Sequence, residues 1–453
     1  MVPAESGYIQ KVSIRKINET LARLREHTGF IRYFKNTSWM MAEHSLRLVA
    51  GLFVGIWVAR YLGPEQFGVF SYVLAFTAIF GGIAKLGLDG IVVRELVNHP
   101  EKRDIFLGTA FWLKFVGAIF VMGTMAAIVP FTSNDSVTNS LIFIISAGLL
   151  FQSFEVVDFY FQSQVLAKIS SICKVIQLAL SSIIKIYLVL AEAELTHFVL
   201  VTAFDAFSLA LSYAIAYKLQ KNQAFYNKFD LNVAKSLLKD SWPLFFALIC
   251  SMLYMKTDQL VIEYYLGFEM LGYYSAALRF YEAWLIIPIV ISVSLMPLIL
   301  NKKNKGERDY LILLSNVYSF LIYLSLAFSL FMLAFGNLVI KYTYGLSYSS
   351  MSSSMIILAF VAPVAAIGSM SVRVLIAENL QRYILYRSLI GLVLNLILNF
   401  MLIPKFGIEG AATSTLISMF IAHYLVNYFG TDLNFINRII NNALVFNCLR
   451  NRK

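Results

Sequence analysis

Charged side chains inside otherwise apolar stretches are the groups in this sequence best suited to bind a polar ligand. A charge at the centre of a bilayer costs about 2.5–3.5 kcal/mol on insertion scales, so such a side chain is expected to face another helix or a watery cavity. Lysine and arginine in such a cavity can form charge-assisted hydrogen bonds with phosphate oxygens. The candidates for a cationic cavity are Arg47, Lys114, Lys174, Lys185, Lys256 and Arg279.

The spacing of these basic residues indicates how they are arranged. Lys174 and Lys185 stand three helical turns apart and share a stripe with Ser181, which indicates a water-filled wall, although Lys174 could instead reach the nearer membrane surface. Lys114 and Lys256 lie deep in their apolar stretches, too far from the ends for easy snorkelling. We expect the deep lysines to face the cavity.

Acidic residues in the same stretches are candidates for ion coupling. Glu155 and Asp158 are three residues apart and concentrate negative charge, so they could bind a proton or a cation. Arg279 and Glu282 have the same spacing and can neutralise each other. The ion-coupling candidates are Glu43, Glu155, Asp158 and Asp258. Residues near the predicted cytoplasmic span ends rank below the deep residues as cavity candidates, with interface anchors or salt bridges as the alternative: Lys85, Asp89, Arg94, Glu95 and Arg373.

One acidic candidate has an obvious local partner. Glu43 and Arg47 are four residues apart and can pair on one helix, as structural support or as part of a cavity wall.

The elements that hold these residues are predicted to be membrane-spanning helices. Apolar residues make up 59% of the 453 positions and charged residues 14%, against about 45–50% and 25% in soluble chains. A span needs roughly 20 apolar residues, and such runs recur from Ser38 almost to the end. The sequence predicts an all-α protein with twelve spans, near 36–60, 66–86, 105–130, 139–161, 169–190, 196–217, 242–266, 271–300, 311–340, 353–376, 384–403 and 408–429.

Basic residues in the loops predict the orientation of the chain. Loops on one side hold 26 Lys and Arg residues, and the opposite loops hold three, namely Arg60, Lys341 and Lys405. Basic loops are retained in the cytoplasm, so both termini are predicted to be cytoplasmic. This one-sided distribution explains the net charge of +11 without nucleic acid as a partner.

An internal repeat predicts two similar halves. Residues 61–76 (YLGPEQFGVFSYVLAF) and 265–280 (YLGFEMLGYYSAALRF) match at a shift of 204, with eight of sixteen positions identical. We expect tight turns in which the paired glycines Gly63, Gly68, Gly267 and Gly272 allow close backbone approach, with Glu65 or Glu269 on turn amides. A shift of six spans keeps the orientation, so the repeat is parallel and favours a transporter with a cavity between two six-helix lobes.

The repeat and the spans divide the chain into segments. These are a basic amphipathic cytoplasmic segment (1–35), an N-terminal lobe (36–217), a cytoplasmic linker (218–241), a C-terminal lobe (242–430) and a basic cytoplasmic tail (431–453). Val12, Ile14, Ile17 and Leu21 recur at helical spacing among basic residues, which predicts a helix on the inner leaflet.

Four segments resemble polysaccharide-export flippases of the Wzx type: ARYLGPEQFGVFSY (59–72), KLGLDGIVVREL (85–96), KTDQLVIEYYLG (256–267) and FGIEGAATSTLIS (406–418). These O-unit flippases belong with multidrug extruders and lipid II flippases in one superfamily of multidrug, oligosaccharidyl-lipid and polysaccharide exporters. The resemblance implies two pseudo-symmetric six-helix bundles and alternating access in a bacterial cytoplasmic membrane.

The substrate follows from the resemblance as well. It would be an undecaprenyl-pyrophosphate-linked oligosaccharide, as in O-antigen and lipopolysaccharide synthesis, moved from the inner to the outer leaflet. No cofactor is implied, although proton or sodium coupling is open, and a polymerase and a chain-length regulator are candidate partners. A pyrophosphate leaving water loses hydrogen bonds worth several kcal/mol per unsatisfied group, which a cationic, hydroxyl-lined cavity would replace.

Other functions are less well supported by the sequence. An O-antigen polymerase or membrane glycosyltransferase usually carries a large outward loop with catalytic residues, whereas the outward loops here are short and hold no catalytic or metal-ligand cluster. A multidrug antiporter would share the fold and differ in cavity chemistry, because cationic drugs favour acidic walls. The charges in the spans discriminate weakly between flippase and antiporter, and the family motifs favour the flippase.

Overall fold

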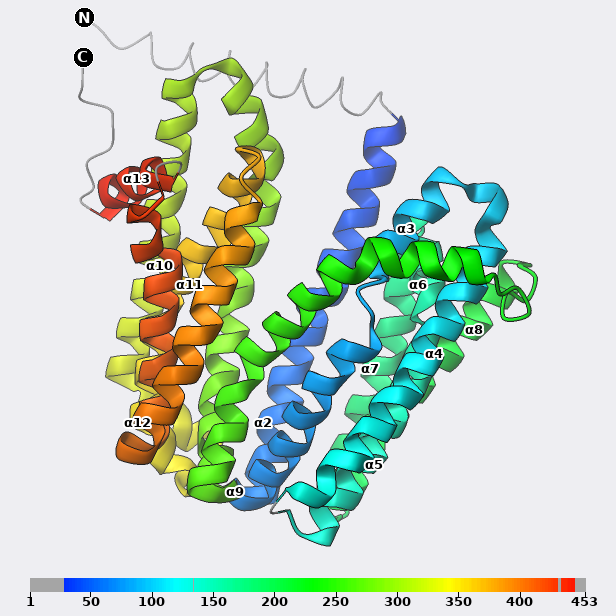
Figure 1. Ribbon diagram of the computed structural model, residues 1–453. Coiled ribbons are helices and arrows are strands. Elements are labelled where there is room, and N and C mark those ends of the chain that lie inside the picture. Colours follow the sequence, from blue (N-terminus) through cyan, green and yellow to red (C-terminus); the bar gives the residue numbers. More distant parts are fainter. Residues whose placement is uncertain (1–27, 133, 431–432, 445–453) are drawn as a thin grey trace, which may run out of the picture.

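The computed structural model describes residues 28–132, 134–430 and 433–444, and within them the chain is helical without a strand (Figure 1). Residues 1–27 of the predicted amphipathic segment lie outside the described residues. The helices are α2 (Thr28–Ala84), α3 (Asp89–Asn98), α4 (Arg103–Ile128), α5 (Ser136–Phe151), α6 (Val156–Ser163), α7 (Ala167–Leu190), α8 (Leu195–Leu219), α9 (Leu231–Lys305), α10 (Glu307–Thr343), α11 (Ser352–Ala377), α12 (Arg382–His423) and α13 (Asn434–Leu444).

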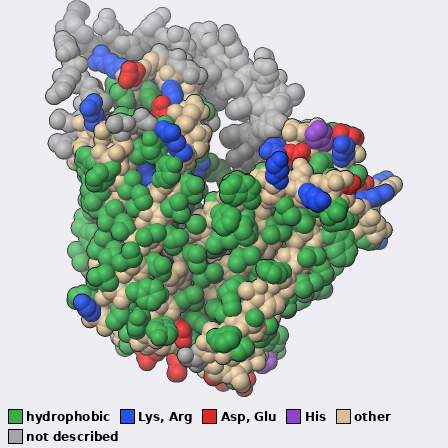
Figure 2. All heavy atoms as spheres, viewed as in Figure 1, with side chains coloured by type: hydrophobic (Ala, Val, Ile, Leu, Met, Phe, Trp, Pro, Cys, Tyr) green, Lys and Arg blue, Asp and Glu red, His purple; other side chains and the backbone are tan. Residues whose placement is uncertain are grey.

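The surface of the molecule has the chemistry of a membrane protein. In the described part of the chain, nine helices are long and apolar enough to cross a bilayer. Large apolar side chains point outward from them, such as Phe53, Phe120 and Ile183, each about two-thirds exposed. Figure 2 shows an apolar band with charged side chains gathered above and below it. An apolar surface of this kind is suited to contact with lipid. The helices can lie in lipid because their backbone N–H and C=O groups are hydrogen-bonded within each helix.

Three of the long helices are interrupted by a glycine with a left-handed or otherwise non-helical backbone. These glycines are Gly63 in α2 (φ 73°), Gly267 in α9 (φ 82°) and Gly407 in α12 (φ 62°). Each coincides with a predicted break between two spans, and Figure 1 shows the α2 and α9 ribbons reversing direction. Positive φ is costly for residues with a Cβ, so glycine is expected here. The count of twelve spans itself stays a prediction.

The two copies of the repeat touch each other through their backbones. A Cβ built on Gly68 would lie 1.7 Å from the carbonyl oxygen of Phe268, and one built on Gly272 would lie 1.8 Å from that of Pro64. Position 64 corresponds to 268 and position 68 to 272 at the shift of 204. The Gly68–Phe268 and Gly272–Pro64 contacts are therefore equivalent to each other by a local two-fold, as in an isologous interface. We call these four residues the glycine seam.

One of the repeat glutamates, Glu269, differs from the expectation for the turns. Glu269 accepts a hydrogen bond from the Tyr273 hydroxyl (2.9 Å) rather than from a turn amide.

The lobes share one hydrophobic core beside the glycine seam. Phe67 and Ala59 of α2 lie in this core with Tyr274 of α9 and Tyr348, whose hydroxyl donates to the Ala59 carbonyl (2.7 Å). At the opposite end, where the described chain begins and ends, each lobe has a separate core, one from Leu88 to Leu237 and one from Ile299 to Ala443. The lobes are thus joined at the seam end and separate at the other, as the ribbons in Figure 1 also show.

Two amphipathic helices lie outside the predicted spans. α3 buries Ile91, Val92 and Leu96 between the first lobe's helices. α13 lies within the segment predicted as a polar tail and buries one face, with Ile436 and Ile440 against α10. Their apolar residues recur at three- and four-residue spacing, which is the pattern of a helix that covers a core.

Candidate functional site

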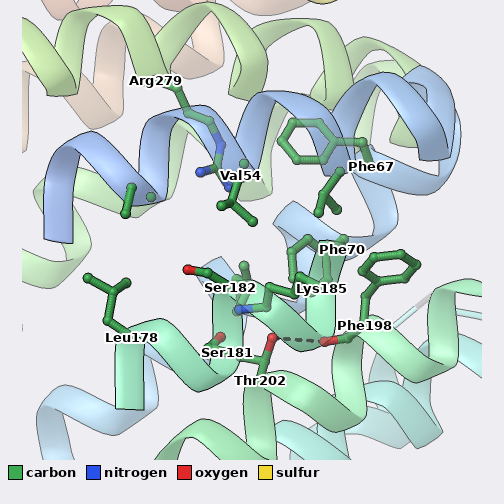
Figure 3. Close-up of a pocket in the computed structure, with 15 residues that line it drawn as sticks. Val54, Phe67, Phe70, Leu178, Ser181, Ser182, Lys185, Phe198, Thr202 and Arg279 are labelled. Carbon is green, nitrogen blue, oxygen red and sulfur yellow. Dashed lines mark hydrogen bonds between the residues drawn. The ribbon is translucent and has the colours of Figure 1, made fainter. Parts of the chain in front are cut away.

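A cavity of about 200 Å³ lies between the lobes and is the centre of the candidate site. Its walls come from α2, α7, α8 and the returning half of α9. Figure 3 shows Arg279 on one side, and Lys185 with Ser181 and Ser182 on the other. Thr202 completes the polar part of the wall. We call this space the inter-lobe cavity.

Arg279 is a cation without a counter-ion in the described residues. Its guanidinium lies over the Phe67 ring, with the central carbon 5.3 Å from the ring centroid. A Cβ at Gly55 would stand 2.6 Å from the Arg279 Nη1, so the absence of a side chain on Gly55 makes room for the guanidinium. The expected pairing with Glu282 is not formed, because that carboxylate lies 3.8 Å from the Lys256 ammonium instead. Arg279 therefore offers its donors to the cavity.

Lys185 on the opposite wall is held by an acidic residue of α8. The Lys185 Nζ lies 3.0 Å from the Asp205 Oδ2, which also accepts from the Ser181 hydroxyl (2.9 Å). The other carboxylate oxygen of Asp205 is buried without a hydrogen-bond partner in the described chain. The ion pair holds the Lys185 ammonium beside the cavity. Lys185 and Ser181, which were predicted to share one face of a helix, both line this cavity.

Two further cavities of about 350 Å³ each continue from the inter-lobe cavity. The middle cavity shares Leu74 and Thr202 with the inter-lobe cavity. The inner cavity shares Lys85 and Asp89 with the middle one. Adjacent walls place the three in sequence, from the region between the lobes to the ends of α2 and α6 on the side of the described termini. A row of adjacent cavities, with a few polar and charged groups in mainly apolar walls, therefore follows the first lobe.

The inner cavity is lined by charges that mostly neutralise each other. Lys174 Nζ lies 2.9 Å from the Asp158 Oδ2, and the Ser170 hydroxyl donates to the same carboxylate. Glu155 faces Lys114 Nζ at 2.7 Å. The two carboxylates predicted to concentrate negative charge thus each have a lysine. Glu155 ends a 3₁₀ turn between α5 and α6, and this change in the helix aims its side chain at α4.

Lys114 is buried against protein rather than open to a cavity. Only 2% of its side chain is exposed, and it lies within 3.9 Å of Asp89 as well as next to Glu155. Its ammonium also sits 5.0 Å from the Phe159 ring centroid. A cation with two carboxylates and an aromatic face close by is fully compensated, so we assign Lys114 to joining α4, α3 and η3 (Gln152–Glu155).

This assignment predicts a stability effect. Replacing Lys114 by Met should destabilise the protein by about 3 kcal/mol, because it leaves the Glu155 carboxylate without its cation. The melting temperature of the purified protein in detergent measures this loss, and adding Glu155→Gln to the same chain should recover part of it. A Lys114→Met protein that melts like the wild type but no longer exports polysaccharide would show that Lys114 contacts substrate instead.

The remaining predicted residues lie apart from the cavities just described. Arg47 pairs with Glu43 (2.9 Å), as expected, and its Nη1 reaches the Gln177 oxygen at 3.5 Å. Lys256 forms a longer ion pair with Glu282, with 3.8 Å between the Lys256 Nζ and the Glu282 Oε1. The Arg47 pair joins α2 to α7 beside the first lobe's polar wall, so the structure supports its predicted pairing.

Asp258 is a buried carboxylate of α9 with no cation within ion-pair distance in the described residues. It is 5% exposed and accepts hydrogen bonds from the Tyr274 hydroxyl and from the Gln259 backbone N–H (2.8 Å). An ionised carboxylate buried in this way is costly unless a proton or a cation joins it. Of the predicted acidic residues, Asp258 therefore fits ion coupling best.

Two residues that line cavities have only a weak signal in the sequence. Lys85 and Asp89 stand near predicted span ends, yet they line both the middle and the inner cavity. The role of Asp205 in holding Lys185 depends on α8 packing against α7, which spacing along one helix does not predict. A signal was present for the first two, because they flank glycines in a motif of the family resemblance.

Known proteins support the interpretation of the fold. The family model described as "Polysaccharide biosynthesis protein" matches residues 33–303. A relative from Haloferax volcanii, the probable flippase AglR, is 26% identical over 395 residues, which cover 82% of this chain and 77% of that protein.

Solved structures show the same fold. The lipid II flippase MurJ in an inward closed conformation aligns with a TM-score of 0.69 at 17% identity, covering 89% of this chain and 90% of its own. An inward-facing multidrug resistance MATE transporter of the MOP superfamily also gives 0.69, at 15% identity and with 87% and 96% coverage. These results, together with the two lobes and the apolar outer surface, show that the chain is a multi-pass membrane protein with the fold of these transporters and that it belongs to the polysaccharide biosynthesis protein family.

Proposed function

We propose that the protein moves an undecaprenyl-pyrophosphate-linked oligosaccharide from the inner to the outer leaflet of a bacterial cytoplasmic membrane by alternating access. The observation that carries the proposal is Arg279, an arginine without a carboxylate partner in the described chain that faces Lys185 across the inter-lobe cavity. Arginine matches the geometry of phosphate oxygens and stays charged in a low-dielectric site.

The inter-lobe cavity offers what a pyrophosphate loses on leaving water. Arg279 supplies unpaired charged donors and Ser182 supplies a hydroxyl group, whereas the Thr202 hydroxyl donates to the Phe198 carbonyl (3.0 Å). Each unsatisfied polar group in hydrocarbon would cost several kcal/mol, so a site that replaces these hydrogen bonds lowers the barrier to crossing. The apolar polyprenyl tail needs no such site and can remain in lipid.

The middle and inner cavities suit the sugar part of the substrate. Several of their charges are paired, as with Lys174 and Asp158, whereas Lys85 forms no ion pair in the described residues, and Gln152 and Gln162 add neutral polar groups to the walls. Paired charges still accept and donate hydrogen bonds but attract neither sign strongly. We place the pyrophosphate between the lobes and the oligosaccharide toward the predicted cytoplasmic mouth.

Alternating access requires a second arrangement of the lobes. In the described arrangement the lobes are joined at the glycine seam and have separate cores at the end of the termini. We propose that this end is cytoplasmic and that substrate release requires the seam to part. A polymerase and a chain-length regulator would then act on the product in the outer leaflet.

The cavity chemistry argues against a multidrug antiporter. A cationic drug would need a carboxylate free to face it, whereas Asp158, Glu155 and Asp205 each lie within 3.0 Å of a lysine. Asp89, which lines the middle and inner cavities, lies 3.9 Å from the Lys114 ammonium. Asp258 is free of such a partner in the described residues, but no cavity described above includes it.

Flipping can be measured directly in proteoliposomes. Purified protein should expose a lipid-linked oligosaccharide to an external glycosidase faster than protein-free vesicles do, and it should leave efflux of a cationic dye unchanged. Dye efflux without any oligosaccharide flipping would replace this proposal with the antiporter. In the host, deletion of the gene should cause lipid-linked oligosaccharides to accumulate.

Coupling to an ion predicts a separate result for Asp258. We expect a proton or sodium gradient to accelerate flipping severalfold, and Asp258→Asn to remove that acceleration while gradient-free flipping persists. The amide keeps the hydrogen-bond shape but cannot take up a proton or neutralise a cation. Glu263→Gln on the same helix is the matched control and should stay gradient-dependent. If the wild type flips equally fast without either gradient, transport is passive and Asp258 is structural.

A further inference from the structure

The second lobe contains a cavity that the proposed transport does not use. It has a volume of about 580 Å³ and is lined by the end of α9, the start of α10, the residue after α11 and one face of α13. Its apolar wall consists of Leu311, Phe435 and Ile439. The lining residues lie at the helix ends on the side of the described termini, where the apolar band gives way to charged side chains (Figures 1 and 2). We call it the α13 cavity.

Part of its charge is already neutralised within the protein. Lys303 Nζ lies 2.8 Å from the Glu378 Oε2 and also donates to the Ala377 carbonyl (2.6 Å). The Tyr310 hydroxyl donates to the other oxygen of Glu378 (2.8 Å). These bonds connect α9, α10 and the end of α11, and the residues that form them line one side of the cavity.

Two opposite charges on the same cavity remain unpaired. Glu307, at the start of α10, and Arg438, on α13, both line the space. Within the described ranges neither of them forms an ion pair or a hydrogen bond, although they carry opposite charge. The cavity therefore offers a cation and an anion that do not meet each other and that a ligand with both signs can bridge.

We propose that the α13 cavity binds a phosphate that carries a primary ammonium, as in the headgroup of an aminophospholipid. The phosphate would accept from Arg438 and the ammonium would donate to Glu307, with Leu311 and Phe435 against the apolar part of the molecule. A purely anionic headgroup would leave Glu307 unpaired and repelled. A trimethylated ammonium has no N–H to donate to that carboxylate. This inference does not depend on the transported substrate.

Lipid retention tests the proposal on the intact protein. We expect native mass spectrometry of protein extracted from equal mixtures of phosphatidylethanolamine, phosphatidylcholine and phosphatidylglycerol to show phosphatidylethanolamine enriched about threefold over each of the others, as one partly exposed pair of charges allows. Glu307→Gln and Arg438→Gln should each abolish the enrichment. Asp309→Asn is the matched control, because Asp309 is two residues from Glu307, pairs with Lys302 (2.8 Å) and does not line the cavity.

Soluble phosphoethanolamine distinguishes a membrane lipid from a soluble compound as the ligand of the α13 cavity. A rise in melting temperature with millimolar phosphoethanolamine, lost in Glu307→Gln, would show that the headgroup chemistry alone suffices and that a soluble compound is a ligand. Enrichment of the lipid without this rise would assign the site to the membrane lipid. Equal retention of all three lipids by the wild type, with no response to phosphoethanolamine, would overturn the proposal even if the variants failed to fold.

Discussion

Replacing Arg279 by Gln should reduce export of surface polysaccharide about 30-fold or more. A hydrogen bond to a charged group is worth about 1.5–3 kcal/mol, and Arg279 faces the inter-lobe cavity without a carboxylate partner in the described chain. Arg279→Lys should retain part of the activity, because it keeps the charge but loses the planar fork of donors. Flipping in proteoliposomes, normalised to the amount of inserted protein, measures the effect without interference from other steps of synthesis.

The control for Arg279 is a cation that lies away from the cavities. Lys405 is exposed near the turn at Gly407, so Lys405→Gln should export normally. A second test is Gly55→Ala, whose Cβ would displace the Arg279 guanidinium by crowding Nη1 and should therefore lower transport without changing any charge. Full export by Arg279→Gln would remove the basis for placing the pyrophosphate between the lobes.

The second large effect is expected at the glycine seam. Gly272→Ala would place a Cβ 1.8 Å from the Pro64 carbonyl oxygen, and because backbone faces backbone, the two lobes must move apart to accept it. Overpacking a well-packed contact typically costs about 1–3 kcal/mol. We expect both a lower melting temperature and a loss of flipping, since the lobes can no longer close at this end.

The symmetry of the seam sharpens this test. Gly68→Ala should have a similar effect, since its Cβ would meet the Phe268 carbonyl, and the double variant should cost less than the sum because both changes open one contact. Gly123→Ala in α4 is the matched control, with no atom within 4 Å of its Cβ, and it should be neutral or slightly stabilising. If Gly272→Ala flips and melts like Gly123→Ala, the seam is not a contact that transport requires.

Local chemistry explains why much of the fold was predictable. A span is set by the hydropathy of consecutive residues, and a reversal within a long helix is set by a glycine that can adopt positive φ, as at Gly63 and Gly267. The repeat predicted tight turns in which its glycines allow close backbone approach, and Gly68 and Gly272 confirm such an approach, each at a carbonyl of the other copy. α13 escaped prediction because its buried isoleucines alternate with asparagines, which lowers the mean hydropathy of the segment.

The site was predictable in its residues and less so in its contacts. Spacing along one helix predicted the Glu43–Arg47 pair, which the structure confirms at 2.9 Å. The same rule was wrong for Arg279 and Glu282, because a partner on another pass of the chain, Lys256, lies nearer to the carboxylate. Helical spacing allows a pair, but packing between helices decides whether the pair forms.

The sequence by itself determined that this chain lives in a membrane, that its halves repeat, and which charges must be sheltered from lipid, since each of these depends on residue type and on separation along the chain. Only the tertiary structure decided which groups surround each charged side chain. Lys114 is enclosed between two carboxylates, whereas Arg279 reaches a cavity unpaired in the described chain. The reason is physical: the cost of a charge in hydrocarbon is the same wherever it stands in the sequence, but the groups that offset this cost come from helices that only packing brings together.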